Sequence, residues 1–182
     1  MRRLRYQVAT SLDGYIAGPN GEVDWIAMDP DIDFAALFAQ FDTAVMGRKT
    51  FLTTLQHGGS GAMPGLDVIV FSRTLRPADY PAVSVVHSDP AESVRSLKAK
   101  PGKDIWLFGG GELFRTLLEA GLVDTVEPAV VPVLLGDGIR MLPPPAARTK
   151  LSLSRHRVYP KSGIVLLEYS VSSNSEFLIP NA

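Results

Sequence analysis

The sequence contains no cysteine. This absence excludes disulfide frameworks, thiolate zinc sites, iron–sulfur clusters and cysteine nucleophiles. Histidine is also scarce, and the three that occur, His57, His87 and His156, are too far apart to offer a metal-ligand spacing such as H-E-x-x-H. We therefore expect no metal site, and the chemistry must come from other residue types.

The sequence also lacks an excess of charge of either sign and any long hydrophobic run. Its 18 Lys and Arg residues against 19 Asp and Glu residues give a formal net charge of -1, which argues against a nucleic-acid-binding protein. No apolar run approaches the roughly 20 residues that cross a bilayer. Polar residues interrupt the stretch 4–17, so it does not form a signal-peptide core. We expect a cytoplasmic protein without a membrane or nucleic-acid partner.

The length of 182 residues fits one domain. We expect this domain to span residues 1–171 and the polar residues 172–182 to form a C-terminal tail. Strand-like runs alternate with helix-like periodicity, which is typical of α/β proteins with a mostly parallel central sheet and helices on both faces. The predicted strands are 5–11, 43–46, 68–71, 83–86, 105–108 and 124–131, and the predicted helices are 33–41, 48–55, 90–98 and 112–120. Segments 151–158 and 164–171 alternate around a Pro- and Gly-containing turn and predict a closing antiparallel hairpin.

Unusual residues follow three of the predicted parallel strands. Gly109, Gly110 and Gly111 open a helix and leave backbone amides uncovered, a geometry that suits a pyrophosphate. Gly47-Arg48-Lys49-Thr50 forms a second such junction and Ser72-Arg73 a third, where an arginine can hold a nucleotide 2′-phosphate. Each motif alone is equally compatible with a tight turn or a solvated basic residue. Ligands of open α/β sheets bind at the carboxyl ends of the strands, so three such junctions in one sheet favour a nucleotide site.

The candidates for acid–base chemistry are carboxylates at the start of the first predicted helix. Asp31 and Asp33 lie two residues apart, so at most one of them faces a pocket squarely. Asp33 shares a helical stripe with Leu37, and Asp31 shares one with Phe34. Helix capping is the alternative role for either acid. Trp25, in a preceding loop, is an additional pocket candidate.

The order of three motifs resembles the dihydrofolate reductase-like fold. These motifs are Val8-Ala9-x-Ser11-Leu12-Asp13-Gly14-x-Ile16-Ala17, then Val45-Met46-Gly47-Arg48-Lys49-Thr50, then Phe108-Gly109-Gly110-Gly111-Glu112-Leu113. Within that fold the sequence is most similar to the reductase domain of the bacterial riboflavin-biosynthesis deaminase–reductase and its stand-alone relatives, over about residues 4–171. A deaminase domain with His and Cys zinc ligands is not expected here. The Leu-Pro-x-Asp-Leu pattern of dihydrofolate reductases is absent, which counts against folate as the substrate.

The resemblance implies a three-layer fold, NADPH as cofactor and hydride transfer to a heterocyclic ring. By motif match, Ala9, Ile16 and Ala17 would line the nicotinamide side, and Gly47, Arg48 and Thr50 would meet the phosphates. Ser72 and Arg73 would meet the 2′-phosphate, and Gly109, Gly110, Gly111 and Glu112 would cradle the pyrophosphate. Asp33 would act as the catalytic acid beside the ring, with Trp25, Asp31, Phe34 and Leu37 as substrate-binding residues.

Two alternatives for the substrate and turnover stay open. One is reduction of a ribosylaminopyrimidine phosphate, for which Arg140 and Lys161 are candidate phosphate ligands. The other is a nucleotide-binding protein without turnover, such as a sensor or an assembly partner. The resemblance also implies a homodimer, since the riboflavin-type domains pair through their late region. The mostly apolar segment 126–135, predicted near the sheet edge, is the candidate surface.

Overall fold

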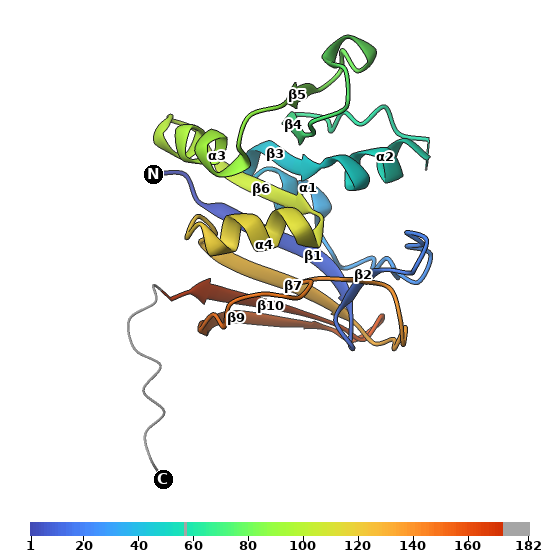
Figure 1. Ribbon diagram of the computed structural model, residues 1–182. Helices are drawn as coiled ribbons and strands as arrows, with labels where there is room; N and C mark the ends of the chain where they lie inside the picture. The colour runs from blue at the N-terminus through green and yellow to red at the C-terminus, as the bar shows by residue number, and fades with distance from the viewer. Residues whose placement is uncertain (57, 173–182) are drawn as a thin grey trace.

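A computed structural model describes residues 1–56 and 58–172, so the predicted tail lies outside the described residues except for Ser172. The chain forms an eight-stranded sheet with helices on both of its faces (Figure 1). The strands of this sheet are β1 (Leu4–Ser11), β3 (Phe41–Gly47), β4 (Asp67–Phe71), β5 (Ser84–Val86), β6 (Asp104–Gly109), β7 (Thr125–Val131), β9 (Leu151–Tyr159) and β10 (Ile164–Val171). The helices are α1 (Phe34–Phe38), α2 (Arg48–Gln56), α3 (Pro90–Ala99) and α4 (Gly111–Glu119), with a short 3-10 turn, η1 (Pro77–Asp79).

The strand order is β5-β4-β3-β6-β1-β7-β10-β9. The first six strands in this order run parallel, and β10 and β9 complete the sheet as an antiparallel pair. The mostly parallel sheet and the closing hairpin are therefore confirmed. A small second sheet that the sequence did not predict pairs β2 (Tyr15–Ala17) with β8 (Ile139–Arg140). The parallel arrangement places the carboxyl ends of β4, β3, β6, β1 and β7 along one edge.

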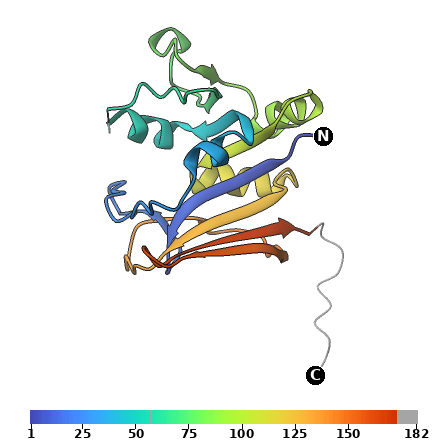
Figure 2. The ribbon, with the colours of Figure 1, turned by 180° about the vertical axis from the view of Figure 1, so that it is seen from behind.

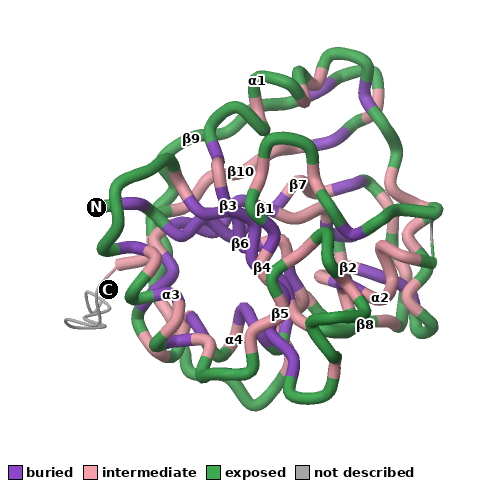
Figure 3. The backbone as a smooth tube through the Cα atoms, turned by 90° about the horizontal axis from the view of Figure 1, so that it is seen from above, coloured by how far each residue is buried: buried purple, intermediate pink, exposed green. Residues whose placement is uncertain are grey.

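Each face of the sheet carries its own layer of packing. Alternate residues of β1 point to opposite faces, so Leu4 and Tyr6 join the core beneath α3 and α4, while Arg5 and Gln7 face the other way. On that other face, α2 packs on a second cluster that includes Phe51 and Trp106. Figure 2 shows α1 on this same face, in front of the sheet. The buried backbone in Figure 3 is concentrated in the central strands, whereas none of the five residues of α1 is buried.

Local sequence signals explain where two helices begin and end. The Asp89 carboxylate accepts a hydrogen bond from the Glu92 amide at 3.0 Å, and Pro90 occupies the first turn of α3. The helix α4 is followed by Gly121 at φ +68°, which is the left-handed residue expected after a helix. No helix in the described part of the chain is long and apolar enough to span a membrane.

The predicted helix over 33–41 is too long. The helix covers only Phe34–Phe38, and the Asp33 carboxylate caps it by accepting from the Ala36 amide at 2.9 Å. Phe41 instead begins β3, where it is 2% exposed and stacks on Trp106 with ring centroids 5.7 Å apart. The spacing of the aromatic residues suggested one continuous helix. Phe41 fits that spacing only by coincidence, because its burial comes from its place in the sheet.

The predicted edge position of segment 126–135 is also wrong. The strand β7 pairs with β1 on one side and with β10 on the other, so it is internal. The returning hairpin covers its free side, and β9 becomes the edge strand of the sheet. The apolar residues of β7, such as Val126, consequently fill the core.

A buried ion pair joins β1 to β7 on the α1 face. Arg5 donates to both carboxylate oxygens of Glu127 at 2.8 Å, and the two side chains are 6% and 3% exposed. Thr125 donates to the same carboxylate at 2.6 Å. Arg5 also donates to Gln40 at 2.7 Å and lies 3.5 Å from the carboxylate of Asp104. The cluster thus ties together four segments that are far apart in the sequence.

We expect Glu127→Ala to lower the free energy of unfolding by about 3–5 kcal/mol, because it leaves the buried Arg5 guanidinium without its main partner. Urea denaturation of both proteins measures this loss. Lys161→Ala is the control, since its ion pair with Asp31 is exposed on both sides and should change stability little. Equal losses for the two variants would contradict the structural role of the buried pair.

Candidate functional site

The three glycine- or arginine-bearing junctions come together at the carboxyl edge of the parallel strands. They follow β4, β3 and β6, which are neighbours in the sheet. In the register of these strands, Gly47 is paired with Phe71, the residue before Ser72, and Met46 is paired with Gly109. The second junction lies about 25 residues after the first in the sequence, and the third about 37 residues after the second. The sheet places all three side by side along one edge.

Thr50, in the first turn of α2, lies against the glycines that follow β6. A Cβ atom built on Gly110 would be 3.0 Å from Thr50 Oγ1, and one built on Gly109 would be 3.7 Å from it. Gly109 also has φ +142°, a conformation that L side chains rarely adopt. The glycines thus keep the backbone beside the Thr50 hydroxyl free of side chains, as an approaching phosphate group requires.

Gly111, the third glycine, has a different surrounding. Its Cβ would lie 2.5 Å from the carbonyl oxygen of Arg140 and 2.9 Å from that of Met141. The start of α4 is therefore packed directly on the backbone at the end of β8, and a side chain at this position has no room. Glu112, the next residue, is exposed and pairs with Arg115 at 2.5 Å.

The basic residues of the edge lie at its β4 end. Arg48 is exposed and donates to Thr74 Oγ1 at 3.1 Å, which directs it toward the loop after β4. In that loop, Ser72 is buried and its hydroxyl oxygen accepts from the amides of Thr74 and Leu75 at 3.2 and 3.0 Å. Arg73 is exposed. Two guanidinium groups and a fixed hydroxyl are therefore available at one end of the glycine-lined edge.

The residues expected on the nicotinamide side, Ala9, Ile16 and Ala17, lie on β1 and β2. The turn between these strands is held by Asp13, whose carboxylate accepts from Ser11 Oγ at 2.6 Å and from the Leu135 and Gly136 amides at 3.1 and 2.7 Å. The Ser11 hydroxyl and these amides lower the pKa of Asp13 to about 2. Asp13 therefore stays ionised and joins the β1–β2 turn to the loop after β7.

The acids singled out from the sequence are already engaged in structural contacts. Asp33 caps α1, and Asp31 forms an exposed ion pair with Lys161 at 2.8 Å. Asp29, which the sequence analysis did not single out, is 2% exposed and accepts from the Ser162 and Asp31 amides at 2.9 Å each. The contact with Ser162 lowers the pKa of Asp29. Asp29 and Asp31 thus anchor the segment before α1 to the turn between β9 and β10.

Aromatic side chains line the sheet face beside α1. Phe38 lies 6.0 Å from Phe34 and 5.3 Å from Trp106, centroid to centroid, and Trp106 makes an edge contact with Phe108 at 4.9 Å. We call these four residues the aromatic row. Of these four, the sequence analysis singled out only Phe34 as a substrate-binding residue. Trp106 is buried, at 8% exposed, whereas Phe38 is 38% exposed and leaves a ring face available for a planar ligand.

Trp25 and Leu37 occupy the borders of this face. Trp25 packs against the cluster of Val131, Tyr159 and Ile164, to which Ala9 also belongs as a partly buried neighbour. Its indole donates to the carbonyl of Glu22 at 3.1 Å. Leu37 is half-buried on α1. The structure thus brings Trp25 near the β1 residues expected on the nicotinamide side, as a substrate-binding role requires.

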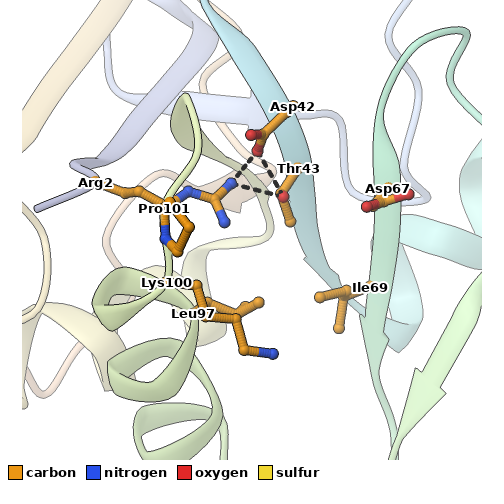
Figure 4. A pocket seen from close by; sticks show the side chains of 8 residues that line it. All are labelled: Arg2, Asp42, Thr43, Asp67, Ile69, Leu97, Lys100 and Pro101. Atoms are coloured by element: carbon orange, nitrogen blue, oxygen red, sulfur yellow. Dashed lines mark hydrogen bonds and ion pairs between the residues drawn. The ribbon is translucent and has the colours of Figure 1, made fainter.

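A polar pocket of about 300 Å³ lies at the opposite edge of the sheet, where β3 and β4 begin (Figure 4). Its buried cation, Arg2, is held by Asp42, by Thr43 Oγ1 at 2.7 Å and by the Lys103 carbonyl. These contacts anchor the N-terminus to the sheet. The charge of Arg2 is already paired, so this pocket is not part of the candidate site. Within residues 1–56 and 58–172, no group of three or more His, Asp or Glu side chains is placed to hold a metal ion.

Comparisons with known proteins agree with this fold. The family model described as the RibD C-terminal domain matches residues 2–165. The uncharacterized protein YyaP of Bacillus subtilis (strain 168) is 37% identical over 179 residues, which cover 92% of this chain and 94% of YyaP.

Two solved structures extend the comparison. A protein of Shewanella sp. PV-4 named for riboflavin biosynthesis superposes with a TM-score of 0.79 at 27% identity, covering 95% of this chain and 100% of that one. A dihydrofolate reductase from Enterococcus faecalis, solved with NADP(H), superposes with a TM-score of 0.68 at 18% identity, covering 94% of this chain and 97% of that one. The fold is therefore dihydrofolate reductase-like, as the sequence motifs predicted.

Proposed function

Because the chain belongs to the RibD C-terminal domain family, we propose that it is an NADPH-dependent reductase of a pterin-like or pyrimidine-like ring. The observation that carries this proposal is the carboxyl edge of β4, β3 and β6, where Thr50 lies beside glycines whose Cβ atoms would fill the space. Such an edge suits a dinucleotide, whose phosphates bind backbone amides and helix N-termini. NADPH would supply the hydride, and the protein aligns the two rings.

We assign the cofactor contacts along this edge from one end to the other. The 2′-phosphate is bound by Ser72 and Arg73. The remaining phosphates are bound by Gly47, Arg48 and Thr50 together with Gly109, Gly110, Gly111 and Glu112. The nicotinamide side is lined by Ala9, Ile16 and Ala17. Gly111 can contribute its backbone amide, and a side chain at this position would meet the Arg140 carbonyl. The exposed Arg73 would supply charge for the 2′-phosphate, and the exposed Arg48 would supply charge for the neighbouring phosphates.

We assign the substrate to the face beside α1. Trp25, Phe34 and Leu37 provide its apolar surroundings, and Asp31 and Asp33 its carboxylates. Among the contacts of the described residues, the Ala36 amide uses only Oδ1 of Asp33, which leaves Oδ2 for a ring N–H. Asp33 is therefore the proposed catalytic residue, which would anchor the ring nitrogens and favour the protonated form of the substrate.

The proposal is tested by following NADPH oxidation with a panel of pterins and pyrimidines, including a ribosylaminopyrimidine phosphate. We expect at least one ring to be reduced. Preference for the phosphorylated compound would favour the riboflavin-type reaction, for which the exposed Arg140 is a candidate phosphate ligand. NADPH binding with no oxidation across the panel would overturn the proposal in favour of a nucleotide-binding protein without turnover.

We expect NADPH to bind more tightly than NADH, because a charge-assisted contact to the 2′-phosphate contributes about 1.5–3 kcal/mol. Arg73→Ala should therefore weaken NADPH binding by about 10- to 150-fold and leave NADH binding unchanged. Isothermal titration calorimetry measures both dissociation constants. Arg76→Ala removes the same charge from the same exposed loop and is the matched control. Equal affinities of the parent protein for the two cofactors would refute the preference, and an unchanged preference in Arg73→Ala would assign the contact to another residue.

We also propose that the protein is a homodimer. Support comes from the edge strand β9, in which every residue from Leu151 to Val158 is exposed. Leu153 is 54% exposed and Val158 57%, and Leu134, in the loop after β7, is 69% exposed. An exposed edge with apolar side chains is a surface that a second copy can cover.

Light scattering after gel filtration should give a mass near twice 19.7 kDa. Leu153→Asp should halve this mass and leave the circular dichroism spectrum unchanged, because it places a charge on the exposed edge without touching the core. Leu134→Asp tests the loop in the same way. A parent mass near 19.7 kDa at micromolar concentration would exclude the dimer.

A further inference from the structure

The side chain of Gln7 is buried with only one end of its amide satisfied. Gln7 is 8% exposed, and its Nε2 atom donates to Glu127 Oε2 at 3.3 Å. Its Oε1 atom is the one buried side-chain nitrogen or oxygen in the described part of the chain that has no hydrogen-bond partner. Buried polar atoms are nearly always paired, because an unpaired one loses the hydrogen bonds that water would give it.

The neighbouring ion pair fixes which end of this amide is free. The Glu127 carboxylate also receives Arg5 and Thr125, so it is held as an acceptor. Turning the amide over would place Oε1 against this carboxylate, an arrangement of two acceptors without a proton between them. The NH₂ group therefore faces Glu127, and the carbonyl oxygen faces away from it.

Gln7 lies on the sheet face that carries the aromatic row. Its register partner on β7 is Glu127, and Arg5, two residues earlier on β1, is paired with Trp106 of β6. The Trp106 indole donates to the backbone carbonyl of Gln7 at 3.0 Å, which fixes the ring beside this strand. Gln7 also precedes Ala9 by two residues on the same face, a separation of about 6.5 Å that a two-ring heterocycle can span.

We propose that Gln7 Oε1 accepts a hydrogen bond from an exocyclic amino group of the substrate. This inference rests on the proposed function and specifies its substrate class. The substrate is a flat heterocycle that packs against the aromatic row and presents a hydrogen-bond donor toward β1. The acceptor at this point is a neutral amide, and Arg5 neutralises the charge of the neighbouring Glu127. The ring therefore needs a donor here but no positive charge.

The proposal separates substrates by one functional group. A ring that carries an amino group at this edge pairs with Gln7 Oε1, whereas an analogue that lacks this group leaves the carbonyl unpaired. Sites that use a buried polar group for a substrate donor reject the analogue without that donor strongly. Discrimination between the two ligands is therefore the property that Gln7 determines.

The test compares two ligands and three proteins. The ligands are 2-amino-4-oxopteridine and 4-oxopteridine, and the proteins are the parent, Gln7→Leu and the control Gln40→Leu. Gln40 accepts from the same Arg5 but lies in the exposed segment after α1. Dissociation constants are measured by fluorescence quenching with NADP⁺ present, so the readout does not depend on turnover.

We expect the parent protein to bind the amino ligand at least tenfold more tightly than the analogue. Gln7→Leu should abolish this preference and leave the dissociation constant of NADPH unchanged, and Gln40→Leu should keep the preference. Equal binding of the two ligands by the parent overturns the inference even if Gln7→Leu does not fold. If a ring is reduced but the two ligands bind alike, the inference fails and the proposed function stands. If NADPH binds and no heterocycle binds or reacts, the proposed function fails as well.

Discussion

The buried ion pair between Arg5 and Glu127 is the interaction on which the arrangement of the α1 face depends. Burial by itself would lower the pKa of Arg5, but the hydrogen bond and the charge of Glu127 more than offset this, so the pKa is raised. The guanidinium remains charged and reaches Gln40 after α1 and Asp104 at the start of β6. The carboxylate in turn orients Gln7. A charge pair that is costly to bury thus sets the positions of groups on β1, β6 and β7 and of the segment that follows α1.

The opposite ends of the glycine triplet perform two different tasks. Gly109 and Gly110 keep the backbone open beside Thr50, whereas Gly111 allows the segment after β8 to lie on the start of α4. The second task supports the first, because the position of α4 determines where the amides of its first turn point. In the proposed reductase, recognition of phosphate groups through the backbone would leave the side chains of the α1 face free to determine which ring is bound.

The fold was largely predictable from local signals, and the site only in part. The buried runs 68–71 and 105–108 and the glycine junctions identify strands and their ends directly, because each signal lies within a few residues. The limits of α1 were not predictable, because the sheet captures Phe41, and the internal position of β7 depends on where a hairpin from later in the chain returns. Gln7 and Glu127 were missed because the role of a polar residue in a strand depends on its partner on the neighbouring strand, which the local sequence does not reveal. The alternation Leu4-Arg5-Tyr6-Gln7, polar on one face, was the available signal.

The hydrogen bonds of Asp13 couple the turn after β1 to the loop after β7. Its carboxylate accepts the amides of Leu135 and Gly136, and the amide of Leu12 donates to the Val133 carbonyl at 2.9 Å. The turn after β1 and the loop after β7 therefore share three hydrogen bonds, and neither can swing outward alone without leaving these groups unpaired. We therefore expect the two loops to open together, and the release of any molecule bound beside Ile16 and Ala17 would then require both to move.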